Sequence, residues 1–183
     1  MEQLEFYIYE QELWCRRADG RNEVVTEHDT ELVQPLLERI REQYPEAYKA
    51  LEKEYQKVSI YVPRYQFLIV RRFCKCNFGR LDTTKMDVDG SGAFNFEKVE
   101  CPLRGECRYE GKICFPKFNT RLSDAELRVM RLVYDGVSKD DIAERLYLSP
   151  NTVKNHIKSV YCKLGIHEKS EFIQYANRNH LFS

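Results

Sequence analysis

Residues 149–165 read SPNTVKNHIKSVYCKLG, from Ser149 to Gly165. At 100° per residue, four apolar residues fall on one side of a helix: Val153, Ile157, Val160 and Leu164. The opposite side carries amides, ammonium groups and a thiol: Asn151, Lys154, Asn155, Lys158 and Cys162. No Asp or Glu occurs between residues 151 and 164, although the chain has 29 acidic residues among 183. This pattern suits a helix laid against phosphates and base edges; the alternative is the solvated face of an ordinary core helix.

Helical spacing holds from residue 122 to the end of the chain. It predicts four helices, at about 123–135, 139–147, 151–164 and 168–179. Ser123 and Glu126 have the spacing of a capping box, Ser138 is placed to cap the second helix, and Gly165 to end the third. This order of helices, with a tight turn between the second and the third, predicts a helix-turn-helix arrangement over residues 122–183.

Four blocks in this region carry a known pattern. They read LSDAE at 122–126, GVSKDDIA at 136–143, LSPNTVKNH at 148–156 and KLG at 163–165. At these residues the chain resembles the LuxR-type (NarL-like) DNA-binding domain, and the resemblance covers residues 121–183. It departs at Ala125, where Arg is common, at Asp141, where Glu is usual, and at Lys169, near where Arg often follows. The lost Arg is expected to weaken an ion pair between helices without touching the DNA-binding face.

The resemblance implies that the third helix enters the major groove of double-stranded DNA. The implied contacts to bases, phosphates or sugar come from Ser138, Asn151, Thr152, Lys154, Asn155, His156 and Lys158. Asn can pair with adenine, and Lys contacts phosphate or guanine. The resemblance also implies a homodimer through the helix at 168–179, with RNA polymerase as a further candidate partner. The candidate dimer residues are Glu171, Gln174, Tyr175 and Arg178.

Residues 1–121 are expected to form a regulatory or assembly region. Apolar spacing predicts a helical hairpin over 30–56, and residues 57–117 are expected to hold a β element and a Cys-rich loop. Within the latter, runs of β-branched and aromatic residues predict strands at 58–62, 65–73 and 93–99, whereas residues 4–15 mix both periodicities and receive no assignment. The fold class predicted for the chain is α+β: N-terminal helices and a small antiparallel β element, followed by an all-α four-helix domain. The region does not resemble a phospho-receiver or an acyl-homoserine-lactone-binding domain.

Five of the seven cysteines lie between residues 74 and 114, and without a secretory signal they indicate metal binding or redox chemistry rather than disulfides. They are Cys74, Cys76, Cys101, Cys107 and Cys114. Cys74, Lys75 and Cys76 lie at the end of the strand predicted at 65–73, so Cys74 and Cys76 are expected to point to one face. Four of the five could then hold Zn²⁺, with Cys74 as the substitute. An iron–sulfur cluster and reduced thiols without metal remain alternatives.

Residues 87–95 read DVDGSGAFN and partly fit a calcium-binding loop. Position 12 of such a loop would be Lys98 in place of the expected Glu, and the flanks do not read as helices. A polar hairpin turn is the better interpretation.

Charge is unevenly distributed in this neutral chain. Residues 1–56 carry 7 basic and 14 acidic side chains, residues 57–121 carry 13 and 7, and residues 122–183 carry 9 and 8. The asymmetry indicates an electrostatic partner for the middle and C-terminal parts. No segment reads as a signal peptide or a membrane span, so a cytoplasmic location is expected.

The sequence therefore predicts a bacterial transcription regulator that binds specific DNA sequences, not an enzyme, because no nucleophile–base pair or phosphate-cradling loop is evident. Two alternatives stay open. One is a protein-interaction or anti-activator module whose LuxR-type domain binds a protein in place of DNA. The other is a regulator that senses redox state through an iron–sulfur cluster.

Overall fold

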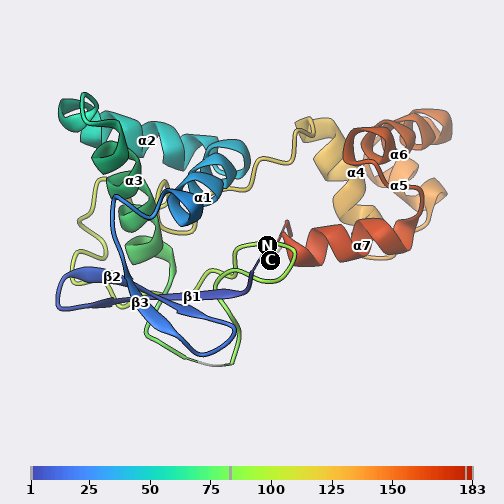
Figure 1. Cartoon of the computed structure of the whole chain (residues 1–183). Coiled ribbons are helices and arrows are strands. Elements are labelled where there is room, and N and C mark those ends of the chain that lie inside the picture. The colour runs from blue at the N-terminus through green and yellow to red at the C-terminus, as the bar shows by residue number, and fades with distance from the viewer. Residues whose placement is uncertain (1, 83, 180, 183) are drawn as a thin grey trace. The chain divides into compact units, whose positions relative to one another are not determined.

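The computed structural model describes residues 2–82, 84–179 and 181–182. The chain forms two compact units, residues 1–117 and 118–183 (Figure 1). The boundary lies four residues before the one expected from the sequence. No helix among the described residues is both long and apolar enough to cross a lipid bilayer.

The first unit begins with a three-stranded antiparallel sheet in the order β1-β2-β3. Its strands are β1 (Leu4–Tyr9), β2 (Glu12–Arg17) and β3 (Asn22–Val25). Glu10 and Gln11 form the turn between β1 and β2, and both have positive φ, the geometry of a tight two-residue hairpin. The buried apolar side chains of the sheet alternate along the strands: Leu4, Phe6, Leu13, Cys15 and Val25; Glu5, between the first two, is buried as well. This period of two packs one face of the sheet against the helices.

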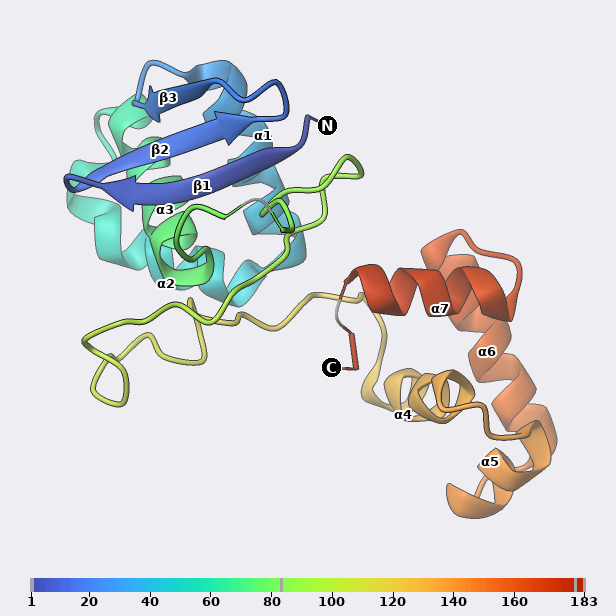
Figure 2. The same ribbon diagram turned by 90° about the horizontal axis from the view of Figure 1, so that it is seen from below.

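Four helical segments follow the sheet. They are α1 (Thr30–Gln43), α2 (Pro45–Tyr55), a short 3₁₀ turn (Gln56–Val58) and α3 (Val62–Asn77). Helices α1 to α3 lie on one side of the sheet (Figure 2). Helices α1 and α2 are the hairpin predicted over 30–56, with Pro45 in the first turn of α2, where its missing N–H leaves no hydrogen bond unmade.

The strands predicted at 58–62 and 65–73 are wrong, because most of this segment is helix α3. Pro63 falls in the first turn of α3, a position that a helix tolerates. The residues buried by α3 cover more than one stripe of the helix: Phe67, Ile69, Val70, Phe73, Cys74 and Asn77. A helix buried so broadly shows a nearly continuous apolar run, which cannot be told from a buried strand by its pattern.

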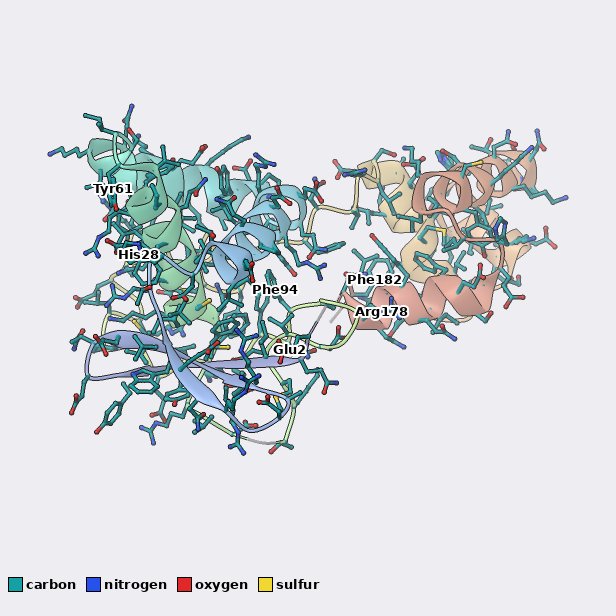
Figure 3. The ribbon with its side chains drawn as sticks, in the orientation of Figure 1. Glu2, His28, Tyr61, Phe94, Arg178 and Phe182 are labelled. Carbon is teal, nitrogen blue, oxygen red and sulfur yellow. The ribbon has the colours of Figure 1, made fainter. Side chains whose placement is uncertain are left out.

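The strand predicted at 93–99 is also wrong. Beyond α3, the described residues up to 117 contain only isolated bridges, among them Leu4 with Val88 and Val88 with Phe94. Phe94 and Phe96 instead insert into an aromatic cluster with Tyr44, Phe73 and Phe78, where ring centroids lie 5.1–6.4 Å apart. Figure 3 labels Phe94. Aromatic packing, not a β ladder, fixes this segment.

The second unit is a bundle of four helices, as predicted. They are α4 (Asp124–Tyr134), α5 (Lys139–Arg145), α6 (Pro150–Leu164) and α7 (Lys169–Arg178). Their core consists of Val129, Met130, Val133, Ile142, Ala143, Val153, Ile157, Val160, Phe172 and Ala176. The expected caps are present: Ser123 makes the capping box with Glu126, Ser138 caps α5, and Gly165 ends α6 at a φ of 66°. The predicted α+β class is confirmed, although the β element lies at residues 4–25.

Candidate functional site

The turn between α5 and α6 sets the angle of the helix-turn-helix. The backbone N–H of Leu148 donates to the carbonyl of Ala143 at 2.9 Å. Tyr147 has a φ of 54° and is 95% exposed at the tip of the turn. Ser149 then caps α6 by accepting a hydrogen bond from the N–H of Thr152 at 3.0 Å. These local bonds fix the direction of α6 before any partner binds.

Helix α6 has the two faces that its sequence predicts. Val153, Ile157 and Val160 are buried in the core of the bundle. The exposed residues of the opposite face are Asn151, Lys154, Asn155 and Lys158. The face therefore offers two amides and two ammonium groups with no carboxylate on the same helix. Such groups can donate to phosphate oxygens and to acceptors on base edges.

The remaining candidate DNA contacts are more constrained. Thr152 and His156 are half-buried, and the Thr152 hydroxyl lies 2.8 Å from the Ser149 hydroxyl. The Ser138 hydroxyl donates to Asp141 Oδ2 at 2.7 Å, so its proton is already engaged within the domain. To donate to a phosphate, Ser138 would first have to break this bond.

An open hollow of about 540 Å³ runs beside α6. Its lining residues are Lys139, Lys154, Ile157, Lys158, Tyr161, Cys162, Gly165, Ile166 and His167. Three lysines and a histidine face it with no acidic residue in its lining, so the hollow favours an anion. Lys139 was not among the sequence candidates. Its position next to the α5 cap, Ser138, was the available signal.

An ion pair joins the start of α4 to the end of α6. Glu126 Oε2 lies 2.7 Å from Lys163 Nζ, and Glu126 Oε1 accepts from the Ser159 hydroxyl at 2.7 Å. The ion pair with Lys163, together with bonds from Ser123 and Ser159, lowers the pKa of Glu126 to about 2. Ala125 stands where an Arg is common in the family. Glu126, the next residue, nevertheless makes an ion pair between α4 and α6.

The candidate dimer helix, α7, has only part of its predicted surface free. Gln174 is exposed, and so is Arg178, which Figure 3 labels. Glu171 accepts from the N–H of His167 and Glu168 in a capping box. The Tyr175 ring packs edge-on against Phe118, with centroids 6.3 Å apart. Gln174 and Arg178 are therefore the residues of this set available to a partner.

The cysteine cluster is divided by helix α3. Residues two apart on a helix point about 200° apart, so Cys74 and Cys76 lie on different sides. The expectation that both thiols share one face was drawn from a strand and is wrong. Cys74 is 2% exposed in the core, where burial raises its pKa well above the usual value. Cys74 therefore does not share a site with Cys76.

Asn77 holds Cys114 beside Cys76. Its side-chain amide donates to the carbonyl of Ile113 at 2.8 Å and accepts from the N–H of Phe115 at 2.9 Å, so it grips both neighbours of Cys114. Burial and, to a smaller extent, the adjacent Cys114 together raise the pKa of the Cys76 thiol to about 12. This pair is the centre of the thiol cluster.

Cys101 and Cys107 lie in the loop that leads to Cys114. Successive turns fold the loop: Arg104 N–H donates to the Cys101 carbonyl at 3.1 Å, and Glu110 N–H donates to the Cys107 carbonyl at 3.0 Å. Both thiols are near enough to Cys114 to raise its pKa, after the larger effect of burial. Among the described residues, however, no three cysteine sulfurs lie within 4.8 Å of one another. The fourfold thiol site remains a prediction.

A group of three carboxylates lies elsewhere in the first unit. Ligand oxygens of Glu5, Asp87 and Glu97 lie within 4.8 Å of one another. In the sequence, Asp87 stands out only as the first residue of the partial calcium-loop pattern at 87–95. Asp89 Oδ1, two residues on, accepts from the N–H of Ser91 and Ala93, as expected of a polar turn. The carboxylate group is a different arrangement, since it joins this segment to β1.

Comparison with known proteins agrees with the geometry of the second unit. Residues 120–176 match the model of the bacterial regulatory proteins of the luxR family. These residues form a LuxR-family helix-turn-helix domain, so the resemblance read from the sequence is confirmed for this part of the chain.

Three curated relatives show how far the likeness extends. The transcriptional regulatory protein LiaR of Bacillus subtilis is 31% identical over 84 residues, which are 46% of this chain and 39% of LiaR. The HTH-type transcriptional regulator MalT of Yersinia pestis is 40% identical over 57 residues, 31% of this chain and 6% of MalT. A putative HTH-type transcriptional regulator of Mycobacterium tuberculosis is 44% identical over 57 residues, again 31% and 6%. The chain thus matches well under half the length of these relatives. No solved structure gives a significant match.

Proposed function

We propose that the chain is a transcription regulator that binds double-stranded DNA through residues 118–183, with α6 in the major groove. The observation that carries this proposal is the acid-free face of α6, whose exposed lysines and asparagines continue into a hollow lined by Lys139, Lys154 and Lys158. A helix is narrow enough for the major groove, and the lysines can neutralise phosphates on either side. The relatives named as regulators support the same function.

The experiment is selection of bound sequences from a random DNA library, followed by measurement of affinity by fluorescence anisotropy. Lys154→Ala should weaken binding to the selected DNA by about 1–3 kcal/mol if Lys154 contacts a base. Lys53→Ala is the matched control, because Lys53 is an exposed helical lysine of the first unit. Binding that survives Lys154→Ala and Lys158→Ala together would reject the groove model. A protein partner would then be the better explanation of the exposed face.

We propose further that the protein binds DNA as a homodimer through α7. The exposed Gln174 and Arg178 are the residues that support it, because Glu171 and Tyr175 already make contacts within the unit. Light scattering should give a dimer mass for the wild type and a monomer mass for the double variant Gln174→Glu, Arg178→Glu. A dimer that persists in the variant would move the interface away from α7.

We also propose that Cys76, Cys101, Cys107 and Cys114 bind a thiophilic metal ion, with Zn²⁺ as the first candidate. The grip of Asn77 on the Cys114 segment supports this, and the loop from 101 to 114 has few apolar side chains to order it otherwise. Elemental analysis should find one zinc per chain and no visible absorption. Iron with broad visible absorption would indicate a redox-sensing cluster, and no metal would reject both.

A further inference from the structure

The three carboxylates in the first unit come from distant parts of the sequence. Glu5 lies on β1, whereas Asp87 and Glu97 belong to the segment that follows α3. Glu5 and Asp87 are each 1% exposed, and Glu97 is half-buried. Carboxylates are seldom buried unless they are paired with a cation or fully hydrogen-bonded. The group therefore needs a physical explanation.

Backbone donors hold the three side chains in fixed positions. Glu5 Oε1 and Oε2 accept from the N–H of Asp82 and Asp87, at 3.0 and 3.2 Å. Asp87 Oδ2 accepts from the N–H of Phe6 at 2.6 Å. Glu97 lies against Gly79, where a Cβ atom would come within 2.0 Å of Glu97 Oε2. The oxygens are thus preorganised, and a side chain at position 79 would displace one of them.

One oxygen of the group lacks a hydrogen bond. Asp87 Oδ1 is buried and has no hydrogen-bond partner among the residues that the structure describes. Asp87 is only 1% exposed, and its carboxylate lies close to those of Glu5 and Glu97. A buried polar atom left without a partner costs free energy, and such atoms are rare in native proteins unless a water or an ion completes them.

The negative charge of the three carboxylates is not balanced by a described basic side chain. None of the described basic side chains forms an ion pair with Glu5, Asp87 or Glu97. Burial raises the pKa of all three carboxyls, and the nearby carboxylate of Asp82 raises those pKa values further. The group must therefore bind protons or a cation.

We propose that Glu5, Asp87 and Glu97 bind one hard divalent cation of the Ca²⁺ or Mg²⁺ class. Oxygen ligands suit these ions, and three carboxylates from two chain segments form a partial cage that water can complete on the half-buried Glu97 side. The ion would fasten the segment after α3 to β1, where Leu4 and Val88 already exchange two backbone hydrogen bonds, at 3.0 and 2.9 Å. It would thereby keep Phe94 within the aromatic cluster. This site is separate from the thiols, which suit softer metals.

The test uses the full chain, passed through chelating resin to remove loosely bound ions while any thiolate-bound metal stays. Isothermal titration with CaCl₂ and with MgCl₂ should show one site per chain for at least one of the two ions, and the same ion should raise the temperature of unfolding. Asp87→Asn, which keeps the shape of the side chain, should weaken binding at least tenfold. Glu97→Gln, at the half-buried edge, should do the same and guards against a folding defect in the first variant.

Glu100→Gln is the matched control, because Glu100 lies near Glu97 in sequence but its side chain is 83% exposed. It should bind the ion as the wild type does. The proposal is overturned if the wild type binds neither ion and its unfolding temperature is unchanged at millimolar concentrations. It is equally overturned if folded Asp87→Asn and Glu97→Gln bind with wild-type affinity.

Discussion

The two units of this protein bury carboxylates in opposite ways. In the second unit, Glu126 is 4% exposed but its carboxylate accepts hydrogen bonds from Lys163, Ser123 and Ser159, and its pKa falls to about 2. In the first unit, Asp87 is 1% exposed and forms an ion pair with none of the described basic side chains, and burial raises its pKa to about 9. A buried carboxylate thus stabilises the second unit as an anion, whereas in the first unit it is stable only when it binds a proton or a cation. The difference shows that the partners of a buried charge, not its burial, decide its effect.

This contrast predicts opposite pH dependences. Asp87 has a folded-state pKa above its unfolded value near 4, so its contribution is favourable below pH 4 and is lost as pH rises toward 9. Without added cation, the first unit should lose up to about 7 kcal/mol over that range, because each of the roughly five pKa units corresponds to about 1.4 kcal/mol. Glu126 has a lowered pKa, so its contribution is full above pH 4.5 and is lost as pH falls toward 2.

Hydrogen exchange of the full chain, followed by mass spectrometry and corrected for intrinsic rates, can separate the two units. Peptides from residues 4–25 should lose protection at high pH, and peptides from residues 124–164 at low pH. Parallel loss of protection in both units at both extremes would contradict the contrast.

Asp87→Asn should give the next largest change in stability. In cation-free buffer at pH 8, the variant should be more stable than the wild type by about 2–3 kcal/mol, because a neutral amide replaces a group that must bind a proton to stay buried. The amide can still accept from the Phe6 N–H and can donate to neighbouring carboxylates. Chemical denaturation with and without Ca²⁺ measures this. A wild type that is more stable than the variant in cation-free buffer would contradict the destabilising effect assigned to the buried Asp87 carboxyl.

Glu126→Gln should have the opposite sign. It removes the charge that Lys163 faces while keeping most of the side-chain volume, and should destabilise the second unit by about 1–2 kcal/mol at pH 7. Lys163 is 41% exposed, so water compensates part of the loss. Thermal unfolding gives the value, and the difference between variant and wild type should vanish near pH 2. A difference that persists there would attribute the effect to packing instead of charge.

Ser149→Ala should give the smallest change, about 1 kcal/mol, because it removes the cap of α6. DNA affinity should fall with it, since the cap sets the first turn of the helix that carries Asn151 and Lys154. Ser149→Asp, which retains a capping oxygen, should restore stability but not affinity, because it adds a negative charge to the acid-free face. Wild-type DNA affinity in Ser149→Ala would separate the cap from DNA binding.

Local signals were sufficient to predict the second unit. Its helices begin at Ser123, Ser138 and Ser149 and α6 ends at Gly165, and each cap is made by residues within a few positions of it. The exposed face of α6 follows from the same periodicity. Lys139 was missed because its place beside Lys154 and Lys158 depends on how α5 packs on α6.

The first unit resisted the same reasoning because its contacts are long-range. The apolar run at 67–70 allows a helix or a strand, and packing of 62–77 against α1 and α2 selects the helix. The sequence of the sheet at 4–25 shows both helical and strand periodicity. The register of its strands is set by the pairing of β1 and β3 with β2 and by burial against the helices. The approach of Glu5 to Asp87 spans 82 residues, and no local pattern reports it.

By itself, the sequence determined the helical domain at the C-terminus, its caps and the acid-free face of α6, because neighbouring residues on one helix create all three. It also identified the five cysteines between residues 74 and 114 as candidates for metal binding or redox chemistry. Only the tertiary structure decided that α3 is a helix, that Cys74 is separated from Cys76, and that three carboxylates meet where no described basic side chain pairs with them. Each of these depends on which distant segments exclude water from one another, and burial of that kind is a property of the assembled fold.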